Sequence, residues 1–198
     1  MPTALRSPAC LTLTEAPPLE HGAWRTTPES YGNDARGAGL PPECTLSIRA
    51  DDSVILAALA VFCAGLFAGA ALYVTAVEHP ARLSCGPALA LREFAPSYRR
   101  GARLQASLAA LGLLLAIGGW FHTGEALLLV GGLILGSVVP FTLLVIFPTN
   151  YRLLDPMLAP ESPEAGALLR RWGYLHAVRT VLGILAFAIL LAGLRRGL

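Results

Sequence analysis

The sequence contains no lysine, although it has fifteen arginines among its 198 residues. The absence of lysine excludes Schiff-base catalysis and the phosphate-binding lysine of P-loop proteins. Charged residues of both signs make up only 14% of the chain, against about 25% in soluble domains. Because so few charges cannot cover a water-facing surface, the composition argues against a soluble enzyme and favours a membrane protein.

Paired cysteines and nucleotide-binding motifs are also missing. The four cysteines, Cys10, Cys44, Cys63 and Cys85, lie far apart and form no C-x-x-C pair, which argues against a redox dithiol enzyme and a zinc ribbon. There is no Rossmann glycine fingerprint, P-loop or haem-attachment motif, so we expect no organic cofactor. The formal net charge of +2 is too small to suggest a nucleic-acid partner.

Residues 1–50 differ in composition from the rest of the chain. They are rich in proline, scattered polar residues and acids, and they contain no apolar run. Such a segment cannot bury enough surface to offset its chain entropy, so we expect a disordered tail. It lacks the apolar middle of a secretory signal, and its acids argue against a mitochondrial transit peptide. We therefore divide the chain into a tail, residues 1–50, and a transmembrane domain, residues 51–198.

Four apolar segments follow the tail. Each approaches the roughly 20 residues that an α-helix needs to cross about 30 Å of hydrocarbon. They are too long and do not alternate as the strands of an outer-membrane barrel would. The sequence therefore predicts an all-α fold, a multi-pass integral membrane four-helix bundle, with helices at about 54–79, 104–121, 125–147 and 163–194.

Prolines indicate where these helices end. A residue before proline is disfavoured in the α region, so we expect the first helix to stop at His79 and the third at Phe147. Pro140 lies inside the third segment and should kink it. The run Ser162-Pro163-Glu164 is typical of a helix start, with an N-cap serine, a proline at the first helical position and an acid in the first turn.

The connections between the segments suggest how the bundle is oriented. Residues 122–125 are so few that the second and third helices must form an antiparallel hairpin. The connections at residues 78–103 and 148–171 are long and rich in arginine. Because positive charge is retained on the cytoplasmic side, we expect both long connections in the cytoplasm and both chain termini outside.

Polar residues gather at the end of the bundle that carries the long connections. Trp172, His176 and Arg179 have i, i+4 and i+7 spacing and share one helical face. Arg179 lies about 11 Å along the axis from Trp172, a depth at which an ionisable group generally faces the bundle interior. We expect Glu78 to be its charge partner. The whole set consists of Tyr73, Thr75, Glu78, His79, Arg103, Gln105, Thr142, Asn150, Trp172, His176 and Arg179.

These residue types suit more than one role. Histidine is the usual general base, and arginine and asparagine can donate hydrogen bonds to a developing oxyanion. His79, His176 and Glu78 could instead form a facial triad for iron, although no H-x-x-x-H or paired E-x-x-H motif supports it. A polar cluster can also serve only to tie helices together, and Trp172 alone is typical of an interfacial aromatic anchor.

Four stretches of the chain resemble the anthrone oxygenase family. They are GLFAGAALYVTAVEHPAR (65–82), REFAPSYRRGARLQASLA (92–109), VVPFTLLVIFPTN (138–150) and WGYLHAVRTVLG (172–183). The ordered combination of E-H-P, P-T-N and W-x-x-x-H-x-x-R carries the resemblance, and no single piece is specific. Together the stretches span most of residues 54–194, and the tail lies outside.

The resemblance implies oxidation of an aromatic polyketide anthrone by O2 to an anthraquinone, without an organic cofactor. By motif it implies catalytic roles among Glu78, His79, Asn150, His176 and Arg179. Substrate-binding candidates are Trp172, Thr142, Gln105 and Tyr73.

Expected partners are membrane lipid and an apolar aromatic small molecule, with a homo-oligomer left open. Two other hypotheses also stay open. One is an iron or copper oxidase, and the other is a non-catalytic carrier or assembly subunit whose polar cluster is structural.

Overall fold

The computed structural model describes residues 42–197, with side chains from residue 52 onward. The sequence predicts a disordered tail over residues 1–50. Residues 1–41 of this segment lie outside the described residues. Its last part differs from the expectation, because a helix begins at Pro42. Proline suits the first helical position, where its missing N–H would have no helical partner in any case.

Four long helical rods make up the described part of the chain, and every element in it is a helix. The predicted all-α fold is therefore confirmed. The first rod consists of α1 (Pro42–Tyr73), η1 (Val74–Glu78) and α2 (His79–Ser84), and the second is α3 (Pro87–Thr123). The third rod consists of α4 (Ala126–Phe141), η2 (Thr142–Ile146) and α5 (Phe147–Leu153), and the fourth is α6 (Pro163–Gly197).

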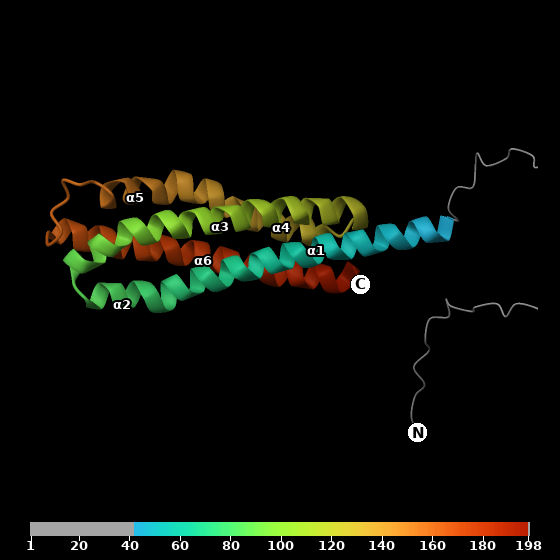
Figure 1. Cartoon of the computed structure of the whole chain (residues 1–198), viewed down its shortest axis with the longest axis horizontal. Coiled ribbons are helices and arrows are strands. Elements are labelled where there is room, and N and C mark those ends of the chain that lie inside the picture. The colour runs from blue at the N-terminus through green and yellow to red at the C-terminus, as the bar shows by residue number, and fades with distance from the viewer. Residues whose placement is uncertain (1–41, 198) are drawn as a thin grey trace, which may run out of the picture. The chain divides into compact units, whose positions relative to one another are not determined.

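The rods form an antiparallel bundle in which each packs against two neighbours (Figure 1). α1 lies beside α3 and α6, and α4 lies beside the same two helices from the opposite side. The first and third rods are thus diagonal partners with little direct contact. Gly124, in the left-handed region with φ of 71°, closes the tight α3–α4 turn. The shorter elements α2 and α5 both lie at the other end of the bundle, on opposite sides of it.

The helix ends predicted at His79 and Phe147 are wrong, because both rods continue past the proline that follows. A π-helical turn stands directly before each proline. In these turns the His79 N–H donates to the Val74 carbonyl, and the Phe147 N–H donates to the Thr142 carbonyl. A proline ring in a regular α-helix clashes with the carbonyl four residues earlier. The wider π turn shifts these carbonyls and gives the ring room.

The connections expected at residues 78–103 and 148–171 are mostly helical rather than looped. Only residues 85–86 and 154–162 lie outside helices there. Buried apolar side chains explain the difference, since Ala90 and Phe94 of α3 pack with Leu169 and Trp172 of α6. This burial stabilises helix at residues whose arginines and prolines suggested a loop. α6 begins as predicted, with the Ala165 N–H donating to Ser162 Oγ at 3.1 Å.

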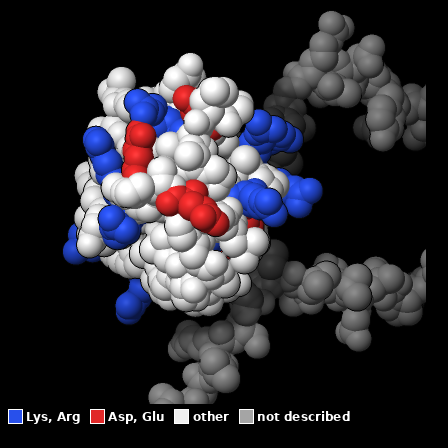
Figure 2. All heavy atoms as spheres, turned by 90° about the vertical axis from the view of Figure 1, so that its left-hand side faces the viewer, with Lys and Arg blue, Asp and Glu red and all other residues white. Residues whose placement is uncertain are grey.

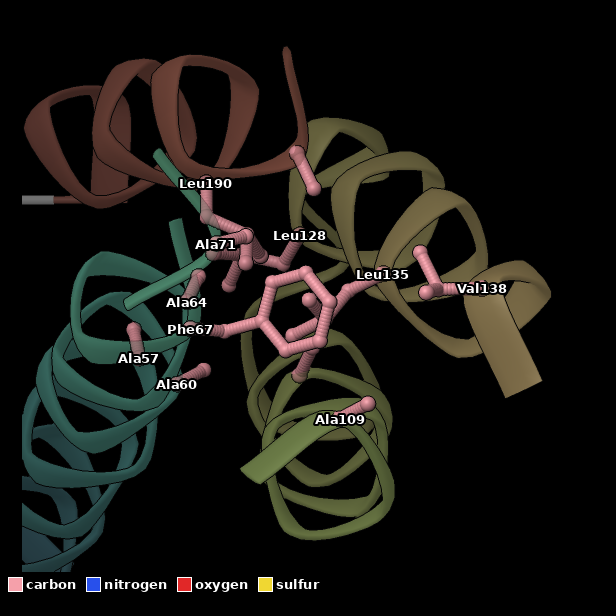
Figure 3. Packing of buried hydrophobic residues seen from close by; sticks show 12 residues of the cluster. Ala57, Ala60, Ala64, Phe67, Ala71, Ala109, Leu128, Leu135, Val138 and Leu190 are labelled. Atoms are coloured by element: carbon pink, nitrogen blue, oxygen red, sulfur yellow. The ribbon is translucent and has the colours of Figure 1, made fainter. Parts of the chain in front are cut away.

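The core between the rods is built on a ladder of small side chains. On the first rod Ala57, Ala60, Ala64, Phe67 and Ala71 are buried at alternating spacings of three and four residues, as in a coiled-coil seam. Figure 3 shows the Phe67 ring projecting from this ladder into the space between the helices. The small neighbours let the helices approach closely, and one large ring fills the centre.

All four rods are long and apolar enough to cross a membrane. Many of their large apolar side chains point outward, with Phe62, Leu114 and Leu144 exposed by 62%, 66% and 77%. Outward-facing apolar side chains along whole helices would be costly in water and are favourable in lipid. The chain is therefore an integral multi-pass membrane protein by the length and composition of its helices.

Gly132 and Gly69 give a matched test of this packing, because each belongs to a G-x-x-x-G pair. A Cβ at Gly132 would lie 2.6 Å from the Ala116 Cβ, whereas a Cβ at Gly69 would meet nothing within 4 Å. We expect Gly132→Ala to lower the free energy of unfolding by about 1–3 kcal/mol through overpacking. Gly69→Ala should leave it unchanged. Thermal unfolding in detergent measures both, and equal effects would contradict the described α3–α4 contact.

Candidate functional site

A cavity of about 270 Å³ lies at the end of the bundle where α2 and α5 are found. Side chains from η1, α2, α3, η2, α5 and α6 line it, and we call it the chamber. Figure 2 looks onto this end and shows arginines around the rim with acidic side chains between them. The polar residues singled out from the sequence lie mostly here, as their common place at the helix ends predicted.

His176 lies in the chamber wall and is held by two hydroxyl groups. Its Nδ1 lies 2.9 Å from Thr75 Oγ1, which lies 2.8 Å from Thr180 Oγ1. The Thr180 hydroxyl donates to the carbonyl oxygens of Ala71 and His176, at 3.2 and 3.0 Å. The two carbonyl oxygens can only accept, so we assign the single Thr180 proton to them; with this assignment the Thr75 hydroxyl donates to Thr180 and accepts from His176 Nδ1.

This assignment of the hydroxyl protons selects one tautomer of the imidazole. Nδ1 carries the proton, so Nε2 carries a lone pair. Among the described residues the ring makes its hydrogen bond through Nδ1 and none through Nε2, and the ring lines the chamber. The arrangement therefore presents an unprotonated nitrogen to whatever the chamber holds.

Arg179 is buried one helical turn deeper and pairs with no carboxylate among the described residues. Its Nη2 donates to Gln105 Oε1 at 2.7 Å, and its guanidinium carbon lies 5.4 Å from the centre of the Phe67 ring. Its Nε finds no acceptor within the described part of the chain. The ion pair with Glu78 expected from the sequence is therefore wrong, since a neutral amide and an aromatic face take its place. The positive charge is left uncompensated.

Glu78 instead pairs with Arg82, four residues further along the same rod. Arg82 also pairs with Glu93 of α3. Ser97 joins the group, donating to Glu78 Oε1 at 2.9 Å and accepting from Arg82 at 3.1 Å. The E-H-P motif therefore serves a network that fastens α2 to α3, with Glu78 and Arg82 facing the chamber.

Asn150 is the most deeply buried polar side chain of the chamber, with 1% exposure. Neither its amide nitrogen nor its amide oxygen has a hydrogen-bond partner among the residues described. A buried amide without partners costs about 1–3 kcal/mol. Such a group in a cavity wall offers one donor and one acceptor to a ligand.

Trp172 is buried, with 6% exposure, so the interpretation as an interfacial anchor is wrong. Its ring stacks on His176 at 4.7 Å between ring centres and meets Phe94 edge-on at 5.3 Å. These rings give the chamber an aromatic wall, against which an apolar aromatic molecule can pack.

His79 lies behind this wall rather than in the chamber lining. Its Nε2–H donates to the Leu169 carbonyl at 3.1 Å, and its ring packs against Trp172 at 5.0 Å. The close fit depends on Gly173, where a Cβ would meet the imidazole at 2.7 Å. The geometry makes His79 a support for Trp172.

Two residues predicted to bind substrate lie elsewhere. Tyr73 is 57% exposed and lines a shallow outer groove. Thr142 donates to the Val138 carbonyl at 2.7 Å and lines a smaller neighbouring cavity. Gln105, by contrast, lies in the chamber as predicted.

Sequence reasoning missed several residues of the site. Arg82 and Thr180 carry a usable signal, since each follows a selected residue by four positions on the same helix. Tyr98 and Ser97 carry no such sequence signal, because they belong to a stretch interpreted as a loop. Phe67 looked like any other apolar residue of a membrane helix.

No group of three His, Cys, Asp or Glu side chains in the described chain is arranged to hold a metal ion. Glu78 is engaged by Arg82, and His79 by a backbone carbonyl. The suggested iron triad of His79, His176 and Glu78 therefore has no ligand set in this arrangement.

The tautomer of His176 can be tested by ¹⁵N NMR of histidine-labelled protein. We expect a neutral Nδ1–H imidazole in the wild type, assigned by its loss in His176→Gln. Thr75→Val should give a mixture of tautomers, because the acceptor for Nδ1–H is gone. Thr142→Val is the matched control, since the Thr142 hydroxyl bonds to its own helix. An Nε2–H signal in the wild type would contradict the assignment.

Comparison with known proteins gives one match. The family described as Anthrone oxygenase matches residues 94–189. The matched region contains Gln105, Asn150, Trp172, His176 and Arg179, whereas Glu78 and His79 precede it. No curated protein and no solved structure matches the chain. Over residues 94–189 the chain is therefore similar to the anthrone oxygenase family, and this region supplies most of the chamber.

Proposed function

We propose that the chamber oxidises an anthrone-type phenolic substrate with O2 to the corresponding quinone. The observation that carries this proposal is the buried guanidinium of Arg179 without a counter-charge, one turn from the free nitrogen of His176. A base next to an uncompensated positive charge favours a reaction in which a neutral substrate becomes an anion.

The first step is removal of a proton from the methylene group between two aromatic rings. Nε2 of His176 accepts the proton, and the electron pair moves through the ring system onto the ketone oxygen. Arg179 and the Asn150 amide supply N–H donors for that oxygen. Because these donors are already in place and dry, little reorganisation is needed as charge develops.

The second step is attack of the electron-rich carbon on O2, and the resulting peroxide anion takes back the proton held by His176 to give a hydroperoxide at that carbon. Loss of the remaining C–H proton breaks the O–O bond and releases water. The methylene carbon loses four electrons overall, and O2 gains them as one carbonyl oxygen and one water molecule. The reaction balances without a further oxidant.

The form of the chamber also supports a flat aromatic substrate. Its volume of about 270 Å³ lies near the lower end of the range for small-molecule sites. Trp172 and Phe94 offer an aromatic wall, and Asn150 offers a donor and an acceptor to polar groups at the edge of the rings.

The orientation in the membrane belongs to the same proposal. The chamber end carries most of the arginines near the membrane, including Arg99, Arg100 and Arg103 of α3 and Arg170 and Arg171 of α6. Positive charge is retained on the cytoplasmic side. We therefore place the chamber near the cytoplasmic face.

A purely structural role for the polar cluster is disfavoured by Asn150. Side chains that only tie helices together bond to one another, as Arg82 and Glu93 do. An amide without a hydrogen-bond partner does not hold helices together, and its burial destabilises the fold. A carrier function would appear as flux in reconstituted vesicles without oxygen uptake.

The direct test supplies purified protein with an anthrone and O2 and follows oxygen uptake and quinone absorbance. We expect His176→Ala to lower the rate about 10²–10⁴-fold, the usual contribution of a general base. His122→Ala is the matched control, because His122 is exposed at the opposite end of the bundle. Wild-type turnover equal to the rate without protein would overturn the proposed function.

Asn150→Leu separates catalysis from stability. Because the amide has no protein partner, an apolar side chain of similar size should keep or raise the thermal unfolding temperature. We expect the oxidation rate to fall about 10²-fold with the loss of one oxyanion donor. A variant that is less stable and equally active would show that Asn150 is structural.

A further inference from the structure

A second, smaller cavity adjoins the chamber. Its volume is about 130 Å³, and it shares Tyr98, Ala102, Gln105 and Arg179 with the chamber lining. The rest of its lining is almost entirely carbon, from Phe67, Ala106, Ala109, Val138, Val139 and Leu143 together with Thr142. The hydroxyl of Thr142 is directed to its own helix. We call this cavity the apolar compartment.

The compartment exists because one wall is made of small residues and the other is irregular. α3 contributes three alanines over two turns, at positions 102, 106 and 109, beside Tyr98 and Gln105. The opposite wall passes from α4 into η2 at Thr142. α3 packs closely along α4 but makes few contacts with η2, so the two rods leave a gap where the π turn begins.

This gap faces the hydrocarbon. Ala106 on one wall and Leu143 on the other are both exposed, Leu143 by 59%. Both belong to helices long and apolar enough to span the membrane, so lipid lies outside them. The compartment therefore lies between the bilayer side of the bundle and the chamber.

The partition between the two cavities is the hydrogen bond from Arg179 to Gln105. Both side chains line both cavities, and Phe67 supports the guanidinium from the compartment side. A molecule that passes this pair arrives beside the group proposed to hold the substrate oxygen.

The size and polarity of the apolar compartment indicate which molecule it can hold. The volume is far below the range of about 300–1,000 Å³ typical of sites for drug-sized ligands, so three fused rings do not fit. Dry apolar cavities of about 150 Å³ bind xenon or benzene. Dioxygen is smaller, apolar and more soluble in hydrocarbon than in water. We propose that the apolar compartment takes up dioxygen from the bilayer and delivers it to the chamber past Gln105 and Arg179.

This inference rests on the proposed function, since it assigns a route to the oxidant of that reaction. It also separates the reactants, because the organic substrate occupies the chamber and oxygen arrives from the lipid side. An organic substrate that needed the same route would compete with oxygen for it, and the kinetic test distinguishes the two cases.

The first experiment probes the compartment without activity. The structure of the wild-type protein under xenon pressure should show xenon in the compartment. Ala106→Phe, which fills the gap from α3, should exclude it, and Ala110→Phe, an exposed position one turn further along α3 that does not line the compartment, should not. Absence of xenon from the wild-type compartment, or an ordered acyl chain in its place, would overturn the proposal.

The second experiment measures KM for O2 and KM for the anthrone separately. In Ala106→Phe, and in Val139→Phe on the opposite wall, we expect KM for O2 to rise several-fold while KM for the anthrone stays unchanged. Ala110→Phe should match the wild type.

The two proposals fail differently. If the wild type turns over but the filled variants keep their KM for O2, or change KM for the anthrone instead, the oxygen route is wrong and the proposed function stands. If the wild type consumes no oxygen with an anthrone, the proposed function fails and the oxygen route fails with it.

Discussion

The burial of Arg179 without a carboxylate is the constraint on which the rest of the site depends. A guanidinium inside a bundle costs several kcal/mol unless its charge is compensated. Here Gln105 and the face of Phe67 supply partial compensation only, and Phe67 is itself fixed by the close approach of Gly183. The bundle thus keeps a positive charge in the wall of the chamber. We propose that a substrate oxygen neutralises this charge when the oxygen becomes negative in the reaction. The free energy that burial of Arg179 costs in the resting protein then stabilises the negatively charged intermediate.

The two π turns hold the walls of this cavity in position. Each stands before a proline that would otherwise end or distort its rod. η1 carries Thr75, which fixes the tautomer of His176, and Glu78, which pairs with Arg82. η2 separates its rod from α3 and is followed by Asn150 on α5. Helical irregularities often occur at functional sites because they turn side chains away from regular spacing.

The sequence predicted the part of this arrangement that depends on composition and period. Four apolar segments required four membrane helices, and their alternating direction required the polar ends of all four to meet at one end. The i, i+4, i+7 spacing on α6 placed Trp172, His176 and Arg179 on one face, and all three line the chamber.

What failed depended on contacts between segments far apart in the sequence. The proline rule predicted helix ends at His79 and Phe147 and could not foresee that a π turn would accommodate each ring. Because residues 78–103 were interpreted as a loop, Ser97 and Tyr98 were not considered as site residues. For the same reason the network of Glu78, Arg82 and Glu93 was not predicted. Glu78 was therefore assigned to Arg179, whose actual partner, Gln105, is neutral.

The most direct test of an uncompensated positive chamber is the visible spectrum of a bound hydroxyanthraquinone, a planar phenol that changes colour on losing its proton. The account predicts that the wild-type protein binds the phenolate form at a pH where the free compound is protonated, and that Arg179→Met binds only the phenol. A phenol spectrum with the wild type, or the same phenolate spectrum with Arg179→Met, would contradict it.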